Sequence, residues 1–503
     1  MRKSFIIACV AFIAICPSAF AQDVDVCLTK PDRSALCEYL PGFTSFTNVI
    51  APAKGWSPFY PTIVVDDRQT YQEIEGFGFA ITGGTAQHLM SMTPEVRKET
   101  IEKVFGRNPG QGGVNYIRLS IGSSDLNSFT FSYDDMPEGE EDFELKHFSL
   151  GQDLKDVVPV VKEILKVNPT IKILGSPWSG PVWMKENKNI RGGKLRKECY
   201  SVYADYFVKY VQAMAEQGIT IDAVTYQNEP QNSKNTPSMP WSAQDGAEFV
   251  GKYLGPKFEA AGLKTKILIF DHNVDREDYP LTILKDNAAD KYTDGIAYHQ
   301  YVGDLTAMTH THMARPDKDI YFTEEMAVEK QFSETIAIAA PIKGNIIDVI
   351  RNWSKNAIMW NLAADSNNDP HTDNGGCSGC QGALAIDNGK VTSYNVVYYV
   401  VAQIAPFVPD GSVRIASTAP YDPAVTLYED EQNPGVFRSI YRERSNVLPN
   451  VAFKTPEGKI ALLVANTTVS DTVVRIQYKG SFAFCPLQAG AVATFVWDSD
   501  FEY

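Results

Sequence analysis

A regular alternation of short apolar strands with longer amphipathic helices runs from about residue 75 to residue 406. This pattern constrains the fold more than any other feature of the chain. Eight β–α repeats in this span predict an α/β fold, a (β/α)8 TIM barrel, with a doubly wound sheet as the structural alternative. The expected strands are Gly76–Ile81, Tyr116–Ser120, Ile171–Ser176, Ala223–Gln227, Ile267–Phe270, Gly295–His299, Ile320–Thr323 and Ala357–Asn361.

The regions on either side of this span have a different pattern. After Pro409, short candidate strands are separated by turns rich in Gly, Asn, Asp and Pro, which predicts a fused β-sandwich side domain. Residues 22–72 are also extended, and we expect them to pair with the C-terminal strands. The predicted division is a signal peptide at 1–21, N-terminal strands of the sandwich at 22–72, the barrel at 73–408 and the C-terminal sandwich at 409–503.

The first 21 residues have the pattern of an export signal. Arg2 and Lys3 supply the positive start, an apolar stretch follows over residues 5–15, and Ala19-Phe20-Ala21 fits the small-x-small cleavage rule. Cleavage near Ala21/Gln22 predicts a secreted, periplasmic or cell-surface protein. The apolar stretch is too short to span a bilayer, so we expect no integral membrane segment in the mature chain.

Six of the eight cysteines would remain after cleavage. In an oxidising compartment, Cys27 and Cys37 are candidates for a short-loop disulfide. The Cys377-Ser-Gly-Cys380 motif favours a structural disulfide over half a zinc site, because no second Cys or His pair matches it. A redox motif is the other alternative for this pair. Cys16 leaves a lipoprotein signal open, although the residue before it suits lipidation poorly.

The formal net charge of −15 argues against nucleic acid or an acidic membrane surface as a partner. The chain has 26 Phe, 24 Tyr and 7 Trp, but aromatic residues build ordinary cores as well as sugar-stacking surfaces. Composition therefore argues against polyanionic partners without identifying a ligand, and the oligomeric state stays open.

Two glutamates follow barrel strands at positions suited to catalysis. Glu229 follows the fourth candidate strand within Asn-Glu-Pro, and Glu325 follows the seventh. Active-site groups of a (β/α)8 barrel lie at the C-terminal ends of strands, where strands four and seven face each other. Hydrolysis of a β-glycosidic bond with retention needs two carboxyl groups about 5 Å apart. The pair indicates Glu229 as general acid/base and Glu325 as nucleophile, although a single such glutamate would more often be a helix cap or a solvated charge.

Several motifs in chain order give the mature sequence a resemblance to glycoside hydrolase family 30, the family of lysosomal glucosylceramidase. The resemblance implies a TIM barrel, double-displacement chemistry by two carboxyl groups, and no metal or cofactor. The motifs are Gly76-Phe-Gly-Phe-Ala-Ile-Thr82, Ile117-Arg-Leu-Ser120 with Asp125, Ser176-Pro-Trp-Ser-Gly-Pro181 with Trp183, Asn228-Glu-Pro230, Gly295-Ile-Ala-Tyr-His-Gln-Tyr301, Glu325 and Trp360-Asn-Leu362.

The resemblance also implies roles for other residues. Arg118 and Tyr301 match groups that keep the nucleophile ionised and oriented, since a guanidinium lowers the pKa of a nearby carboxyl group. His299 matches a pocket residue, with a core histidine as the alternative. The remaining matches form the walls and floor of a sugar subsite. The substrate-binding residues expected in total are Arg118, Asp125, Trp178, Asn228, His299, Tyr301 and Trp360.

Glu324 and Glu325 are adjacent, and strand geometry offers a way to choose between them. Successive side chains on a strand point to opposite sides. If Phe322 packs outward against the helices, then Thr323 and Glu325 point inward and Glu324 points away. We therefore expect Glu325 to be the nucleophile and Glu324 to be solvated or paired with a basic neighbour.

The sequence thus predicts a secreted retaining β-glycosidase acting on a β-glucan or β-glucoside, and a β-1,6-glucanase above all. The segment Gly375–Cys380 resembles the cysteine-bearing loop of the β-1,6-glucanase branch, and Gln300 stands where glucosylceramidase has Trp. Glucosylceramidase or broad β-glucosidase activity within the family is the alternative. A non-catalytic glucan-binding protein is a further alternative, which the presence of both Glu229 and Glu325 disfavours.

Overall fold

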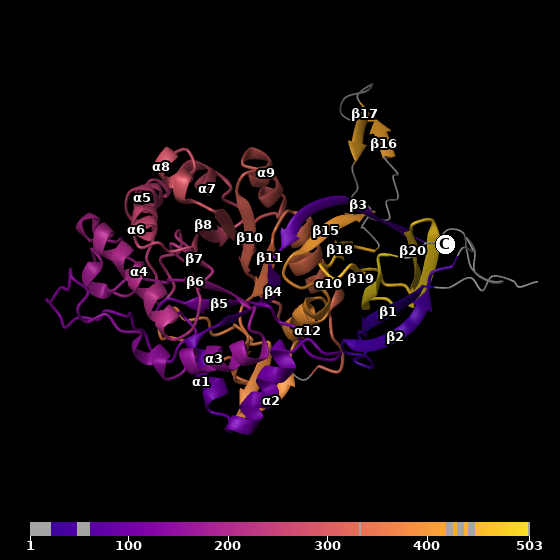
Figure 1. The fold of residues 1–503 in the computed structure, drawn as a ribbon, viewed down its shortest axis with the longest axis horizontal. Coiled ribbons are helices and arrows are strands. Elements are labelled where there is room, and N and C mark those ends of the chain that lie inside the picture. The colour runs from indigo at the N-terminus through magenta and orange to yellow at the C-terminus, as the bar shows by residue number, and fades with distance from the viewer. Residues whose placement is uncertain are drawn as a thin grey trace, which may run out of the picture.

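The computed structural model describes residues 22–47, 61–330, 333–418, 426–429, 437–440 and 448–500. The expected signal at residues 1–21 lies outside the described residues. Figure 1 shows a helix-covered barrel joined to a mainly β body, in which the indigo N-terminal strands lie among the yellow C-terminal ones. No helix within the described ranges is long and apolar enough to cross a membrane.

Eight parallel strands form the barrel, in the order β10-β9-β8-β7-β6-β5-β4-β11. A parallel bridge between Ile320 and Ser354 joins the two ends of this order and closes the ring. Alternate side chains such as Tyr116, Leu268 and Tyr321 fill the interior. The predicted TIM barrel is confirmed. Its strands are β4 (Gly76–Ile81), β5 (Tyr116–Ser120), β6 (Lys172–Ser176), β7 (Ala223–Thr225), β8 (Lys266–Asn273), β9 (Gly295–His299), β10 (Asp319–Glu324) and β11 (Asn356–Met359).

Helices cover the outside of the barrel, as Figure 1 shows. Thr93 caps α2, because its hydroxyl accepts a hydrogen bond from the backbone N–H of Val96. The helices are α1 (Gly83–Met90), α2 (Pro94–Phe105), α3 (Val157–Val167), α4 (Tyr200–Glu216), α5 (Ala243–Phe249), α6 (Gly255–Ala260), α7 (Asp278–Ile283), α8 (Asn287–Tyr292), α9 (Thr306–Ala314), α10 (Ala339–Ile342), α11 (Val349–Arg351) and α12 (Val396–Ala402). Short 3-10 or π segments are η1 (Gly151–Leu154), η2 (Val182–Met184), η3 (Lys197–Cys199), η4 (Val250–Leu254), η5 (Lys343–Asp348) and η6 (Ala405–Phe407).

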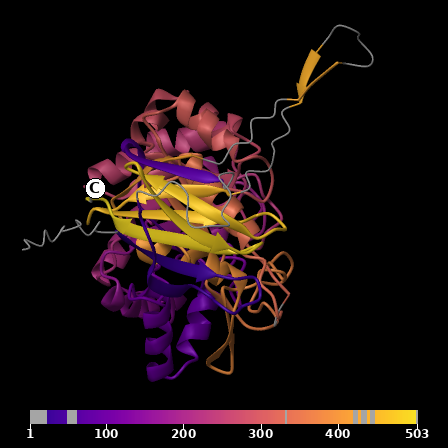
Figure 2. The same cartoon turned by 90° about the vertical axis from the view of Figure 1, so that its right-hand side faces the viewer.

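The second body is a nine-stranded sheet in the order β2-β1-β22-β19-β18-β15-β3-β20-β21. The N-terminal strands are integral to it: β1 pairs with β22, and β3 lies between β15 and β20 (Figure 2). A bridge between Thr47 and Phe482 brings the two ends of this order together. Its strands are β1 (Asp23–Thr29), β2 (Glu38–Ser45), β3 (Thr62–Ile74), β15 (Ser412–Ser417), β18 (Asn450–Lys454), β19 (Lys459–Ala465), β20 (Thr472–Tyr478), β21 (Ser481–Leu487) and β22 (Val492–Asp498). Two smaller sheets contain β12 (Ala363–Ala364), β13 (Leu384–Asp387) and β14 (Lys390–Tyr394), and β16 (Thr426–Glu429) with β17 (Phe437–Ile440).

The two bodies share one packed interface. Phe77 of the barrel packs edge-on against Phe453 of β18, with ring centroids 6.3 Å apart. Arg351 donates to the backbone carbonyls of Asn450 and Ser417 at 2.6 and 2.8 Å. The amide of Gln403 donates 2.8 Å to the carbonyl of Cys27. The apolar core of the barrel thus continues into the sandwich.

The expected disulfide between Cys27 and Cys37 is wrong, because both residues are free thiols in the structure. Cys37 has a positive φ of 49°, and its sulfur lies 3.6 Å from the Thr29 hydroxyl and 3.7 Å from the Gln403 amide oxygen. The Cys27 and Cys37 thiols are hydrogen-bonded to each other as well, so the two residues are neighbours that the structure keeps as separate thiols. Cys377 and Cys380 do form a disulfide, which closes a loop of the barrel mouth.

Candidate active site

Arg118 is the centre of a buried polar cluster at the C-terminal ends of the barrel strands. Its side chain on β5 is fully buried, and its guanidinium donates to Glu324 at 2.5 Å, Asn228 at 2.7 Å and Asp271 at 2.9 Å. It also donates to the Ser176 hydroxyl at 3.2 Å. An arginine used in this way holds groups from four other strands in one arrangement, because its donors form a rigid fork.

Glu229 lies just past β7 and is 7% exposed. One carboxylate oxygen accepts from the Asn232 amide at 2.7 Å. The other lies 3.4 Å from His299 Nδ1 and 3.8 Å from His272 Nε2. The backbone N–H of Glu229 donates to the carbonyl of Asp271, which positions the residue from the neighbouring strand.

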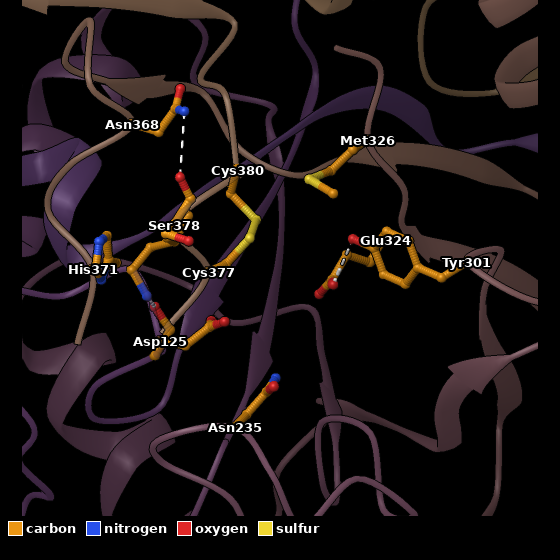
Figure 3. The surroundings of a disulfide bond; sticks show 12 residues. Asp125, Asn235, Tyr301, Glu324, Met326, Asn368, His371, Cys377, Ser378 and Cys380 are labelled. Atoms are coloured by element: carbon orange, nitrogen blue, oxygen red, sulfur yellow. Dashed lines mark hydrogen bonds between the residues drawn. A yellow bond between two sulfur atoms is a disulfide. The ribbon is translucent and has the colours of Figure 1, made fainter. Parts of the chain in front are cut away.

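The structure contradicts the expected orientation of the two adjacent glutamates. Glu324, and not Glu325, accepts hydrogen bonds from both Arg118 and Tyr301, the second at 2.9 Å (Figure 3). Glu325 is half-buried, and its carboxylate accepts from the neighbouring backbone N–H of Met326. Of the two, Glu324 is therefore the carboxylate that faces Glu229 across the site.

A β-bulge explains why strict alternation fails here. In the pairing of β10 with β9, Phe322 lies opposite Tyr298 and Glu324 lies opposite His299, so Thr323 is an extra residue. Thr323 points inward, because its hydroxyl donates 2.6 Å to Asp271. A bulge re-aims the side chain that follows it, and Glu324 consequently points inward as well.

Asp271 is a site residue that the sequence motifs do not include. It is fully buried and accepts from Arg118, His299 and the hydroxyls of Thr225 and Thr323. Although burial disfavours the charged form, Arg118 and His299 hold the pKa of Asp271 far below its ordinary value. Asp271 lies at a second bulge, between Phe270 and His272 in β8, which no sequence pattern reveals.

His299 bridges the acidic groups of the cluster. Its Nε2 lies 3.0 Å from Asp271, and its Nδ1 faces both Glu229 and Glu324. Burial opposes a charge on the ring, but the carboxylates of Glu324 and Asp271 outweigh it and raise the pKa of His299 to about 10. Burial likewise acts to raise the pKa of Glu229, and His299 lowers it to about 2. The pair therefore holds one proton at neutral pH and titrates as a unit.

A cavity of about 480 Å³ opens above these groups. Trp360 lines this cavity and stacks on Trp178 with ring centroids 5.3 Å apart, and the Arg118 guanidinium lies 4.9 Å from the Trp178 ring. Burial, with the charges of Glu324 and Glu229, raises the pKa of Asp125 to about 8. One carboxyl oxygen of Asp125 has no hydrogen-bond partner.

The disulfide forms one wall of this cavity. Figure 3 shows Cys377 and Cys380 between Asp125 and Met326, facing Glu324 and Tyr301. The backbone of the same loop is fixed to Asp125, whose carbonyl accepts from the N–H of Thr372 at 2.9 Å. All seven expected substrate-binding residues lie in this cluster or around this cavity.

Glu229, His299 and Glu324 place possible metal-ligand atoms within 4.8 Å of one another, the only such group among the residues with described positions. Each of these atoms also has a protein partner. Arg118 and Tyr301 contact Glu324, and Asp271 contacts His299. The arrangement suits two carboxyl groups facing each other at the separation that retaining glycoside hydrolysis needs.

Comparison with known families and proteins agrees with this geometry. Residues 74–403 match the Glycosyl hydrolase family 30 TIM-barrel domain, and residues 411–495 match the Glycosyl hydrolase family 30 beta sandwich domain. The chain is 30% identical over 471 residues to endo-1,6-beta-D-glucanase neg1 of Aspergillus fumigatus, covering 89% of this chain and 90% of that protein.

The chain is also similar to an enzyme with a different named activity and to a solved structure. Lysosomal acid glucosylceramidase of Mus musculus is 25% identical, over 82% of this chain and 79% of that protein. The solved structure of an endo-beta1,6-glucanase superposes with a TM-score of 0.82 at 30% identity, over 95% of this chain and 100% of that chain.

Proposed function

Because this chain belongs to glycosyl hydrolase family 30 and is a glycoside hydrolase, we propose that it cleaves β-1,6-glucan with retention of configuration. The observation that carries the mechanism is the facing pair of Glu229 and Glu324, whose oxygen atoms lie within 4.8 Å. Carboxyl groups this close favour double displacement, since an inverting enzyme needs room for a water molecule between them.

In this mechanism Glu324 attacks the anomeric carbon. Its two oxygens accept from Arg118 and Tyr301, an arrangement that matches an ionised carboxylate. Burial raises the pKa of Glu324 above its ordinary value, while His299 and Arg118 act against this rise. These positive groups thus oppose the effect of burial in part, and the carboxylate of Glu324 stays poorly solvated.

Glu229 donates a proton to the leaving oxygen and later removes one from water. The Glu229–His299 pair shares one proton. The two facing atoms, Glu229 Oε1 and His299 Nδ1, lie 3.4 Å apart beside the cavity. In the first step the shared proton passes to the leaving oxygen as the bond to the anomeric carbon breaks. In the second step water attacks the glycosyl–Glu324 ester, and the pair regains its proton.

The substrate proposal rests on the relatives and on the cavity wall. The fungal relative and the solved relative named above are both endo-β-1,6-glucanases. The similarity to the fungal enzyme extends over 90% of that enzyme's length. Trp360, which lines the cavity and stacks on Trp178, provides an apolar face for a sugar ring, and Asp125 provides a free hydrogen-bond acceptor for its hydroxyls. Glucosylceramide hydrolysis is the second candidate, supported by the similarity to lysosomal glucosylceramidase.

We also propose that the protein is exported, from the charged start, apolar stretch and Ala19-Phe20-Ala21 of residues 1–21. N-terminal sequencing of the protein recovered from its native host should begin near Gln22. A mature chain that begins at Met1 would contradict export by this signal.

Parallel product analysis tests the substrate. The purified enzyme is incubated with β-1,6-glucan, β-1,3-glucan, xylan and glucosylceramide, and the anomeric signals of the first products are followed by proton NMR. We expect fastest release from β-1,6-glucan, with the β-anomer formed first. Rapid cleavage of glucosylceramide with no release from β-1,6-glucan would overturn the substrate proposal, and first formation of the α-anomer would overturn retention.

A further inference from the structure

Lys185 has an unusual environment at the barrel mouth. Its side chain is completely buried between the segments that follow β6 and β7. Its Nζ donates to the Ser179 hydroxyl at 2.9 Å, the Ile190 carbonyl at 3.0 Å and the Ser238 carbonyl at 2.8 Å. One lysine thus joins three stretches of chain around the site.

All three partners require a hydrogen from Nζ. The two carbonyl oxygens can only accept, and the Ser179 hydroxyl already donates to the carbonyl of Gly180 at 3.0 Å. An ammonium group provides three donors, whereas a neutral amine provides two. The geometry therefore matches the charged form of Lys185.

No carboxylate pairs with Lys185 within the described part of the chain. The nearby charged side chains of the same segments have other partners: Lys188 contacts Glu141, Lys194 contacts Asp245, and Arg191 donates to a loop carbonyl. Burial alone lowers the pKa of Lys185 to about 7. An unpaired buried ammonium costs stability, so stability does not explain the residue.

The contacts of Lys185 lead directly to the catalytic glutamate. Ser238 belongs to the segment after β7 in which residues 231–235 line the cavity. Asn232 of that segment donates to Glu229 at 2.7 Å. The hydroxyl of Thr236, two residues before Ser238, donates to the carbonyl of Asn374 in the disulfide loop.

We infer that Lys185 is a positioning residue that holds the cavity-lining segment 231–235 beside Glu229, through its hydrogen bonds to Ser179, Ile190 and Ser238. This segment lies on the acid/base side of the site, where the leaving part of the substrate departs. Lys185 therefore governs binding of a polymeric substrate without touching it. The inference depends on the proposed function only for its kinetic readout.

The test compares Lys185→Met, which removes all donors, with Lys185→Gln, which keeps two. Lys194→Met is the matched control, because Lys194 lies on the same segment but is exposed.

KM and kcat are measured on β-1,6-glucan and on an aryl β-glucoside, and hydrogen exchange is followed over residues 230–241. For Lys185→Met we expect a roughly tenfold higher KM on the polymer, the effect of one lost charged hydrogen bond. The kcat on the aryl glucoside should stay within about twofold, exchange should rise, and Lys185→Gln should be intermediate.

Thermal unfolding at pH 6 and pH 9 tests whether Lys185 is held as a buried ammonium at a cost in stability. Burial lowers the pKa of Lys185 in the folded protein to about 7, so the cost in stability is fully present below about pH 7 and declines gradually as pH rises from there towards the ordinary pKa of lysine. The Tm of Lys185→Met relative to wild type should therefore be more favourable at pH 6 than at pH 9, and Lys194→Met should show no such difference.

Unchanged KM and unchanged exchange over 230–241 in Lys185→Met would overturn the inference. So would a large fall in Tm with a parallel loss of kcat on both substrates, which would indicate a structural role alone. If wild type proves inactive on both substrates, the proposed function fails, and the exchange comparison still decides the role of Lys185.

Discussion

At the scale of single residues, the two adjacent glutamates give the sharpest prediction. Glu324→Ala should lose several orders of magnitude in rate, because it removes the carboxylate that we propose forms the covalent intermediate. Glu325→Ala is the matched control and should keep most of the activity. A mechanism-based 2-fluoro glycoside, followed by peptide mass spectrometry, should label Glu324. Labelling of Glu325, or loss of activity in Glu325→Ala alone, would restore the assignment made from the sequence.

The sequence predicts the site residues that lie in continuous motifs. It does not predict those whose side chains reach the site only because the backbone is irregular. Arg118, Asn228 and Tyr301 fall within recognisable motifs after strands, and the structure brings them together. Asp271 could not be predicted, because it lies in no such motif and points inward only through a bulge in β8. The alternation rule failed at Glu324 for the same reason, since the period of two holds only while the ladder is regular.

At the scale of elements, the disulfide loop after β11 should shape binding more than stability. Cys377 and Cys380 line the cavity and pack near Trp360, but they enclose only two residues. A link this short constrains the unfolded chain little. The double variant Cys377→Ser/Cys380→Ser should therefore raise KM on β-1,6-glucan severalfold while Tm falls by only a few degrees. Ser378→Ala in the same loop is the control. A double variant with unchanged KM would show that the wall does not contact substrate.

At the scale of the whole molecule, periodicity predicted the architecture well. Every barrel strand expected from the sequence has a counterpart in the structure, because parallel strands buried on both faces form continuous apolar runs. The sequence pattern does not predict strand β21, because Pro486 interrupts its alternation. A proline is tolerated there because β21 is the last strand in the order of its sheet.

The same architecture predicts that the barrel does not function alone. The sandwich contains strands from both ends of the chain, and β3 runs directly into the barrel, where the N–H of Glu75 donates to the carbonyl of Lys355. Removing residues before 73 and after 408 would expose Phe77 and strip Arg351 of its carbonyl partners. Because the barrel core continues into the sandwich, this loss uncovers apolar surface that favours aggregation. We expect residues 73–408 expressed alone to be mostly insoluble, and any soluble fraction to unfold at a much lower temperature than the full chain. Soluble yield, circular dichroism and activity on an aryl β-glucoside, each against the full-length protein, check this. A soluble fragment with full activity would show instead that the sandwich is a detachable module.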